Sequence, residues 1–208
     1  MIKNLPIVIF VILLSFSNLS FSQVENPYAG FEPLDLKNHK EYSKNFNAGN
    51  FSTKIFYNCL TDVIDAARKQ YAYLEPLKHD IAFDSTAQMQ ADYQALKNEK
   101  TDINLAPYKT LNFRLKKYGL SHRGVELVTK GKAYIGIQDF SYYDACMELI
   151  RPILKNQKQA VILLDPQYTY VGIGFETDEF MKSMYASIVL GNDRTFTIYT
   201  YSPLDKMA

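Results

Sequence analysis

Large apolar residues alternate with glycines from residue 171 to residue 175. A period of two is typical of a β-strand, whose successive side chains point to opposite faces. One face of this strand carries large apolar side chains and the other carries two glycines: Val171, Ile173 and Phe175 against Gly172 and Gly174. Glycine weakens a strand, so two glycines on one face predict the close approach of another backbone or of a ligand.

Two earlier segments have apolar residues at helical spacing instead. The first spans residues 55–71, with Ser52 as its cap and Pro76 as its limit. The second spans residues 83–96. It is expected to turn four side chains inward: Phe83, Ala87, Ala91 and Leu96. Both segments therefore predict helices that pack on a core.

Two further helices are predicted between residues 110 and 152. A short one covers residues 110–118, and Gly119 stands in the stop position. Three basic side chains near its end indicate a solvated helix terminus: Arg114, Lys116 and Lys117. The longer helix begins at Asp139 or Ser141 and is broken or kinked by Pro152.

Short extended segments separated by turn residues come late in the chain. They are predicted over residues 125–128, 184–190 and 196–201, in addition to the strand at 170–175. Helices therefore come first and hairpin-linked strands come last. This order favours an α+β domain with an antiparallel sheet.

The first 22 residues have the composition of a secretory signal peptide. Lys3 precedes an apolar run of about 10 residues, which as a helix is about 15 Å long against a hydrocarbon layer of about 30 Å. We expect cleavage after Ser22 and a secreted protein, extracellular or periplasmic, with no integral membrane segment after signal removal. Residues 23–50 are polar and aperiodic and predict an N-terminal arm or linker, so the folded domain is expected over residues 51–202.

Charge and cysteine content narrow the classes of function. Without Lys3 the chain has 22 basic and 22 acidic residues, so no net field attracts it to nucleic acid or to an anionic membrane. Cys59 and Cys146 are too few for a disulfide scaffold, and their spacing matches no metal-binding motif. Both lie on apolar helical stripes, and whether they form a bridge stays open.

The order of several short motifs resembles the CAP domain of cysteine-rich secretory proteins, antigen 5 and pathogenesis-related proteins. The resemblance covers roughly residues 55–191. Its parts are Leu77-Lys78-His79-Asp80, then Phe83 with Ala87-Gln88 and Ala91, then Arg114 before Gly119, then Glu126 before Gly131, and finally Asp165-Pro166 with Tyr168-Thr169 and Val171-Gly172-Ile173-Gly174. The last segment is the most specific match. The resemblance implies a three-layer α-β-α sandwich with a central antiparallel sheet.

The cleft of the CAP family typically gathers two histidines and one or two acidic residues, which can hold a divalent cation. Both histidines are missing at the matching positions of this chain. The first position falls near Ile103 or Asn104, and the second is Gln159. Glu126 retains the carboxylate. Amide oxygens are poor zinc ligands, so the resemblance implies a cleft lined by Glu126, Gln159 and Asn104, with no metal and no cofactor.

Three roles stay open for Glu126: a structural group that accepts hydrogen bonds from the backbone or from Gln159, a ligand-binding residue, or an exposed side chain. We expect a non-catalytic binding or interaction module for a small lipid or a protein partner, because some relatives bind sterols or fatty acids. The alternative is a hydrolase in which Glu126 is the general base, assisted by His122 or Asp144.

Overall fold

The computed structural model describes residues 26–28, 30–47, 49–121, 123–133, 140–178 and 182–196. The predicted signal peptide, residues 1–22, lies outside the described residues. So does the predicted last strand after Phe196. A search of the described helices finds none with the length and hydropathy needed to cross a membrane.

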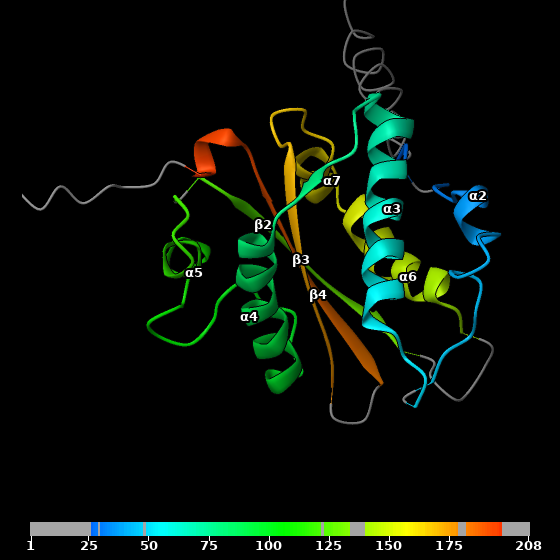
Figure 1. Ribbon diagram of the computed structural model, residues 1–208, viewed down its shortest axis with the longest axis horizontal. Helices are drawn as coiled ribbons and strands as arrows, with labels where there is room; N and C mark the ends of the chain where they lie inside the picture. Colours follow the sequence, from blue (N-terminus) through cyan, green and yellow to red (C-terminus); the bar gives the residue numbers. More distant parts are fainter. Residues whose placement is uncertain are drawn as a thin grey trace, which may run out of the picture.

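A single sheet of the described strands forms the middle layer, in the order β1, β3, β4, β2 (Figure 1). Their bounds are Lys78–His79 for β1, Val125–Lys132 for β2, Tyr170–Thr177 for β3 and Ser183–Gly191 for β4. Strands β2, β4 and β3 are antiparallel, as the sequence predicts. The two-residue strand β1 pairs in parallel with β3, so the sheet is mixed. The 3-10 helix η1, Asp193–Phe196, takes up the start of the predicted last strand.

Helices cover both faces of the sheet and give an α+β fold with three layers (Figure 1). Helix α4 packs on β3 and β4 on one face, while α6 packs on β2 on the other face and against α3. The bounds of the helices are Leu34–Lys37 for α2, Thr53–Ala72 for α3, Ile81–Lys97 for α4, Leu111–Lys117 for α5, Tyr142–Lys155 for α6 and Gln157–Leu163 for α7.

Polar caps fix the starts of the long helices. Ser52 caps α3 through its side chain, as predicted, and Asp80 caps α4. Helix α6 begins after Ser141, one of its two predicted starts. Pro152 does not end α6, which continues to Lys155. The proline removes one backbone hydrogen bond of the helix, and the helix tolerates this loss. The break falls instead at Asn156, which caps α7.

The glycine face of β3 packs against the backbone of α4. A Cβ atom at Gly172 would lie 2.2 Å from the carbonyl carbon of Phe83, and one at Gly174 would lie 2.2 Å from that of Ala87. The predicted close approach is therefore made by another backbone. Leu96, expected to point inward from α4, is 76% exposed instead. It follows Ala91 by five residues, which turns it away from the stripe formed by Phe83, Ala87 and Ala91.

Helix α4 also closes the outer edge of β3. The backbone N–H of Ile173 donates to the Asp84 carboxylate at 2.8 Å. The Gln88 amide accepts from the N–H of Phe175 at 3.1 Å and donates to its carbonyl at 3.0 Å. These contacts satisfy the edge where β1 no longer pairs, and an edge satisfied in this way offers little to an added strand.

The segment predicted as an arm lies against the domain where the structure describes it. Phe31, Tyr42 and Phe46 are buried in the main core. The Asn26 amide donates to the carbonyl of Leu154 at 3.1 Å, at the end of α6. These contacts attach the segment to α3 and α6.

Cys59 of α3 and Cys146 of α6 are free thiols with no exposed surface. Burial raises the pKa of the Cys146 thiol, and a hydrogen bond with Cys59 raises it further. Both thiols therefore behave as small apolar groups in this core.

Candidate functional site

Glu126 lies on β2 and its side chain faces the α4 side of the sheet, where it meets α5 and β4. Its Oε2 atom lies 2.5 Å from Nη2 of Arg114, and its Oε1 atom accepts a hydrogen bond from the Ser187 hydroxyl at 2.7 Å. The side chains of Arg114 and Glu126 are 0% and 4% exposed. Both carboxylate oxygens are therefore engaged inside the protein.

Burial raises the pKa of Glu126, while the charge of Arg114 and the hydrogen bonds from Ser187 and Arg114 oppose that rise. The direction is upward because the carboxylate loses its hydration when it is buried. An isolated charge at this depth would be costly, and Arg114 supplies the opposite charge. The arrangement is that of a structural ion pair.

Arg114 was expected at a solvated helix end together with Lys116 and Lys117, and this expectation is wrong for Arg114. Helix α5 turns Arg114 inward, where its Nη1 atom also donates to the carbonyl of Tyr108 at 3.3 Å. Lys116 and Lys117 remain exposed. The three residues are close in sequence, so their charge alone did not distinguish a buried residue from an exposed one. On a helix they point in different directions, and only Arg114 faces the core.

The two amide residues predicted for the cleft hold other segments in place. The Asn104 amide donates to the carbonyl of Met89 at 2.9 Å and to the Gln90 side chain at 3.2 Å, so it fixes the loop before α5 to α4. Gln159 of α7 donates to the carbonyl of Val128 at 3.4 Å. Glu126 is thus a residue of β2, and Gln159 contacts the same strand at Val128. Within the described residues, no hydrogen bond joins the two side chains.

Of the two residues proposed to assist Glu126 in catalysis, the structure describes only Asp144, and its carboxylate is engaged elsewhere. Asp144 forms a capping box with Ser141 at the start of α6, where its carboxylate accepts from the Ser141 hydroxyl at 2.6 Å. His122 lies outside the described residues. Among the residues that are described, no three histidine, cysteine or acidic side chains are grouped to hold a metal ion. The Glu126 carboxylate is a poor candidate ligand for zinc, because both of its oxygens are already engaged by Arg114 and Ser187.

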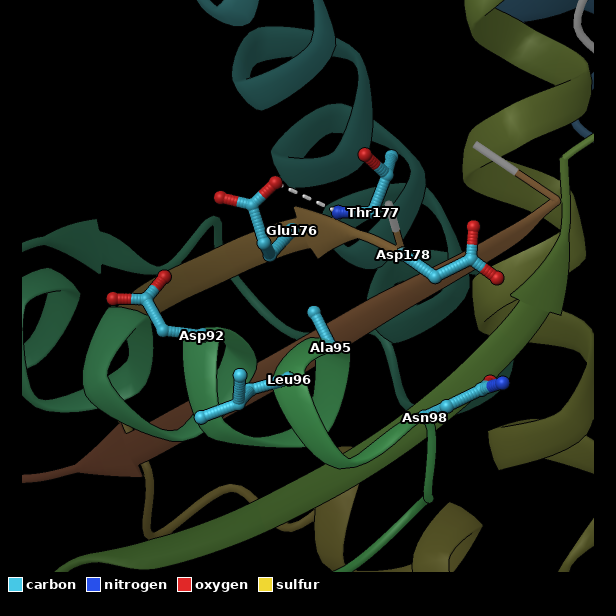
Figure 2. A pocket seen from close by; sticks show the side chains of 7 residues that line it. All are labelled: Asp92, Ala95, Leu96, Asn98, Glu176, Thr177 and Asp178. Atoms are coloured by element: carbon cyan, nitrogen blue, oxygen red, sulfur yellow. Dashed lines mark hydrogen bonds between the residues drawn. The ribbon is translucent and has the colours of Figure 1, made fainter. Parts of the chain in front are cut away.

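An open pocket of about 540 Å³ lies elsewhere, between the second half of α4 and the end of β3 (Figure 2). Figure 2 shows residues of α4 on one side of it and Glu176, Thr177 and Asp178 on the other. The residues from α4 and just after it are Asp92, Ala95, Leu96 and Asn98. The sequence pattern does not predict this pocket, because Leu96 was expected to point inward and is exposed instead.

A second hollow of about 200 Å³ shares Glu176 and Thr177 with this pocket. Its other lining residues are mostly apolar and come from α3, the segment before it and the sheet: Phe46, Phe51, Thr53, Phe175 and Met184. The rings of Phe51 and Phe175 are stacked at 5.7 Å between centroids. The two hollows adjoin at Glu176 and Thr177 at the end of β3, and we refer to them together as the β3-end groove.

No protein-family model matches the sequence, and a search of curated proteins finds no similar one. Solved structures are similar at low sequence identity. An outer surface protein from Borrelia burgdorferi has a TM-score of 0.53 at 15% identity, over 68% of this chain and 96% of that one. The CAP domain of Enterococcal PrgA has a TM-score of 0.48 at 12% identity, over 87% of each chain.

The chain shares the fold of the outer surface protein from Borrelia burgdorferi. An extracellular protein containing a SCP domain from Bacillus anthracis str. Ames is also similar, with a TM-score of 0.48 at 16% identity over 69% of this chain. The chain spans 45% of that protein's length. At these identities the likeness concerns the fold alone. Within this fold, Glu126 forms a buried ion pair with Arg114, and the β3-end groove is an open feature at a separate place.

Proposed function

We propose that this chain is an exported CAP-like domain that acts by binding a partner, with no catalytic activity of its own. Export is supported by the signal-peptide composition of residues 1–22 and by the fold shared with an outer surface protein of Borrelia burgdorferi. The ligand classes implied by the family resemblance are small lipids and proteins.

The observation that carries the proposal is the state of the Glu126 carboxylate. A general base must come within hydrogen-bond reach of the proton that it removes. Both Glu126 oxygens are taken by Arg114 and Ser187, and the side chain is 4% exposed. A substrate would have to displace a buried arginine to reach it, so the group is suited to holding α5 on the sheet.

A hydrolysis screen on peptide and ester substrates tests the absence of catalysis. It compares the wild-type chain with Glu126→Gln, which keeps the shape and the Ser187 hydrogen bond, and with His122→Ala. We expect the three proteins to give the same rates as buffer. Turnover in the wild type that is lost in either variant, with both variants folded by circular dichroism, would instead establish the hydrolase alternative.

Calorimetric titration with zinc tests the donor set separately. We expect no stoichiometric site in the micromolar range or tighter. A site of that affinity that disappears in Glu126→Gln would show that the carboxylate can leave Arg114 to bind metal, and it would remove the main support for a purely structural Glu126.

A further inference from the structure

Three carboxylates line the β3-end groove. Asp92, Glu176 and Asp178 line it, and no ion pair to any of them occurs within the described residues. Asp92 accepts from the Gln88 amide at 2.6 Å, and Glu176 accepts from the N–H of Thr177 at 2.9 Å. Asp178 accepts from the backbone N–H of Lys182 at 2.7 Å. Neutral donors of this kind hold the carboxylates in place and leave their charge available.

The field of these carboxylates reaches a neighbouring tyrosine. Burial raises the pKa of Tyr57 to about 12, and Asp84, Asp92 and Glu176 add to the rise. Tyr57 donates a hydrogen bond to Gln88, beside Asp92. The charges therefore act together along this side of α4.

The carboxylates are spread along the groove and do not surround one point. In Figure 2 the Asp178 carboxylate lies at the opposite end of the pocket from those of Asp92 and Glu176. Consistent with this, no three acidic groups of the described residues are placed to hold one metal ion. An extended occupant with separated positive charges fits this spacing better than a single small cation.

Apolar surface accompanies the charge in both hollows. Leu96 and Ala95 line the larger hollow, and Phe51, Phe175 and Met184 line the smaller one. A volume of about 540 Å³ lies within the range of roughly 300–1,000 Å³ that ligand pockets have. Lys130 lies beside the larger hollow, with its Nζ atom 3.1 Å from the Asn98 side chain, and it marks an end that a positive group would avoid.

The occupant cannot be held as an added strand. The outward N–H groups of Ile173, Phe175 and Thr177 donate to Asp84, Gln88 and Glu176. Recognition at this edge must therefore use side chains. We propose that the β3-end groove binds an exposed basic segment of a partner protein, with arginine or lysine side chains at the carboxylates and a neighbouring aromatic or aliphatic side chain in the hollow lined by Phe51 and Phe175. This inference rests on the proposed binding function and names its partner class.

Fluorescence anisotropy with a labelled peptide, Gly-Arg-Phe-Gly-Arg-Leu-Gly, tests the proposal. Matched probes replace both arginines by citrulline, which keeps the shape without the charge, or replace Phe and Leu by Ser. We expect the citrulline peptide to bind about tenfold more weakly or worse, and the serine peptide to lose about fivefold or more. Spermine serves as a competing polycation without apolar side chains.

The protein variants are matched in charge. Glu176→Gln with Asp178→Asn removes two carboxylates from the groove and keeps their backbone hydrogen bonds. Asp35→Asn with Glu41→Gln removes two exposed carboxylates elsewhere. We expect the first pair to weaken the arginine peptide about fivefold or more and the second to change it less than about twofold, with the difference shrinking as salt rises from about 0.05 to 0.3 M.

Equal losses in the two double variants would mean attraction to net charge alone, and this result overturns the proposal. Spermine binding as tightly as the peptide, with the serine peptide unaffected, would identify a polycation site and also overturns it. Absence of peptide binding to the folded chain does the same. None of these outcomes touches the non-catalytic assignment, which is decided by the hydrolysis and zinc experiments.

Discussion

Removing Arg114 should make the stability of this protein depend strongly on pH. In Arg114→Met, the Glu126 carboxyl keeps the Ser187 hydrogen bond but loses Arg114, the one cation paired with it among the residues that the structure describes. Two charges about 4 Å apart attract by about 4 kcal/mol at an effective dielectric constant of about 20. Breaking a buried pair typically costs about 3–5 kcal/mol, and we expect a loss of that size at pH 7.

The sign of the pH dependence follows from the pKa of Glu126. Burial already raises this pKa above its ordinary value of 4.5 in the wild type, and loss of Arg114 raises it further. Below pH 4.5 the carboxyl is neutral in both the folded and the unfolded chain. As pH rises, the unfolded chain ionises first, so this group's contribution to the free energy of unfolding falls by about 1.4 kcal/mol for each pH unit until the folded carboxyl ionises too.

The assay is urea unfolding followed by circular dichroism at pH 4.5, 5.5 and 7. The control is Arg114→Met with Glu126→Gln, which removes both charges and keeps an acceptor for Ser187. We expect this double variant to be flat with pH and to recover most of the loss at pH 7, short of about 1 kcal/mol for the hydrogen bond to Tyr108. A loss below about 1 kcal/mol at pH 7, or a double variant less stable than Arg114→Met there, refutes the buried pair.

Two further predictions concern packing. Gly174→Ala places a Cβ 2.2 Å from the carbonyl carbon of Ala87, so thermal unfolding should show that the free energy of unfolding falls by about 2 kcal/mol or more. Gly30→Ala, whose Cβ would have nothing within 4 Å, should lower it by less than about 0.5 kcal/mol. Similar melting temperatures for the two variants would contradict the close approach of α4. Cys59 and Cys146 should resist a thiol reagent in the folded chain and react in urea, because both are fully buried; rapid labelling without denaturant would show that the core opens.

The parts of the fold that depend on local sequence were predictable. The alternation around Val171 predicted β3, and the two glycines beside it predicted a close neighbour. Caps such as Ser52 and Ser141 marked helix starts, because a side chain that satisfies orphan N–H groups is local chemistry. The parallel strand β1 was not predictable, since two residues carry no periodicity and its pairing depends on the distant β3.

The candidate site was less predictable because it depends on contacts between distant segments. Glu126 was identified from its motif, but its partner Arg114 was assigned to solvent by the charge of its neighbours. The carboxylates of the groove lie about 80 residues apart in the sequence, so no motif joins Asp92 to Glu176. Only the packing of α4 on β3 brings them to one place.

That packing also decides where a partner can bind. Gly172 and Gly174 let α4 lie directly on β3, and at this distance Asp84 and Gln88 reach the strand's outer edge. The edge is closed as far as Phe175. Beyond it, the second half of α4 and the end of β3 line the open groove, which carries Asp92 on one side and Glu176 on the other. A change that lifts α4, such as Gly174→Ala, should therefore weaken the arginine peptide even in the fraction of the chain that stays folded, because the two sides of the groove belong to the two elements that the glycine holds together.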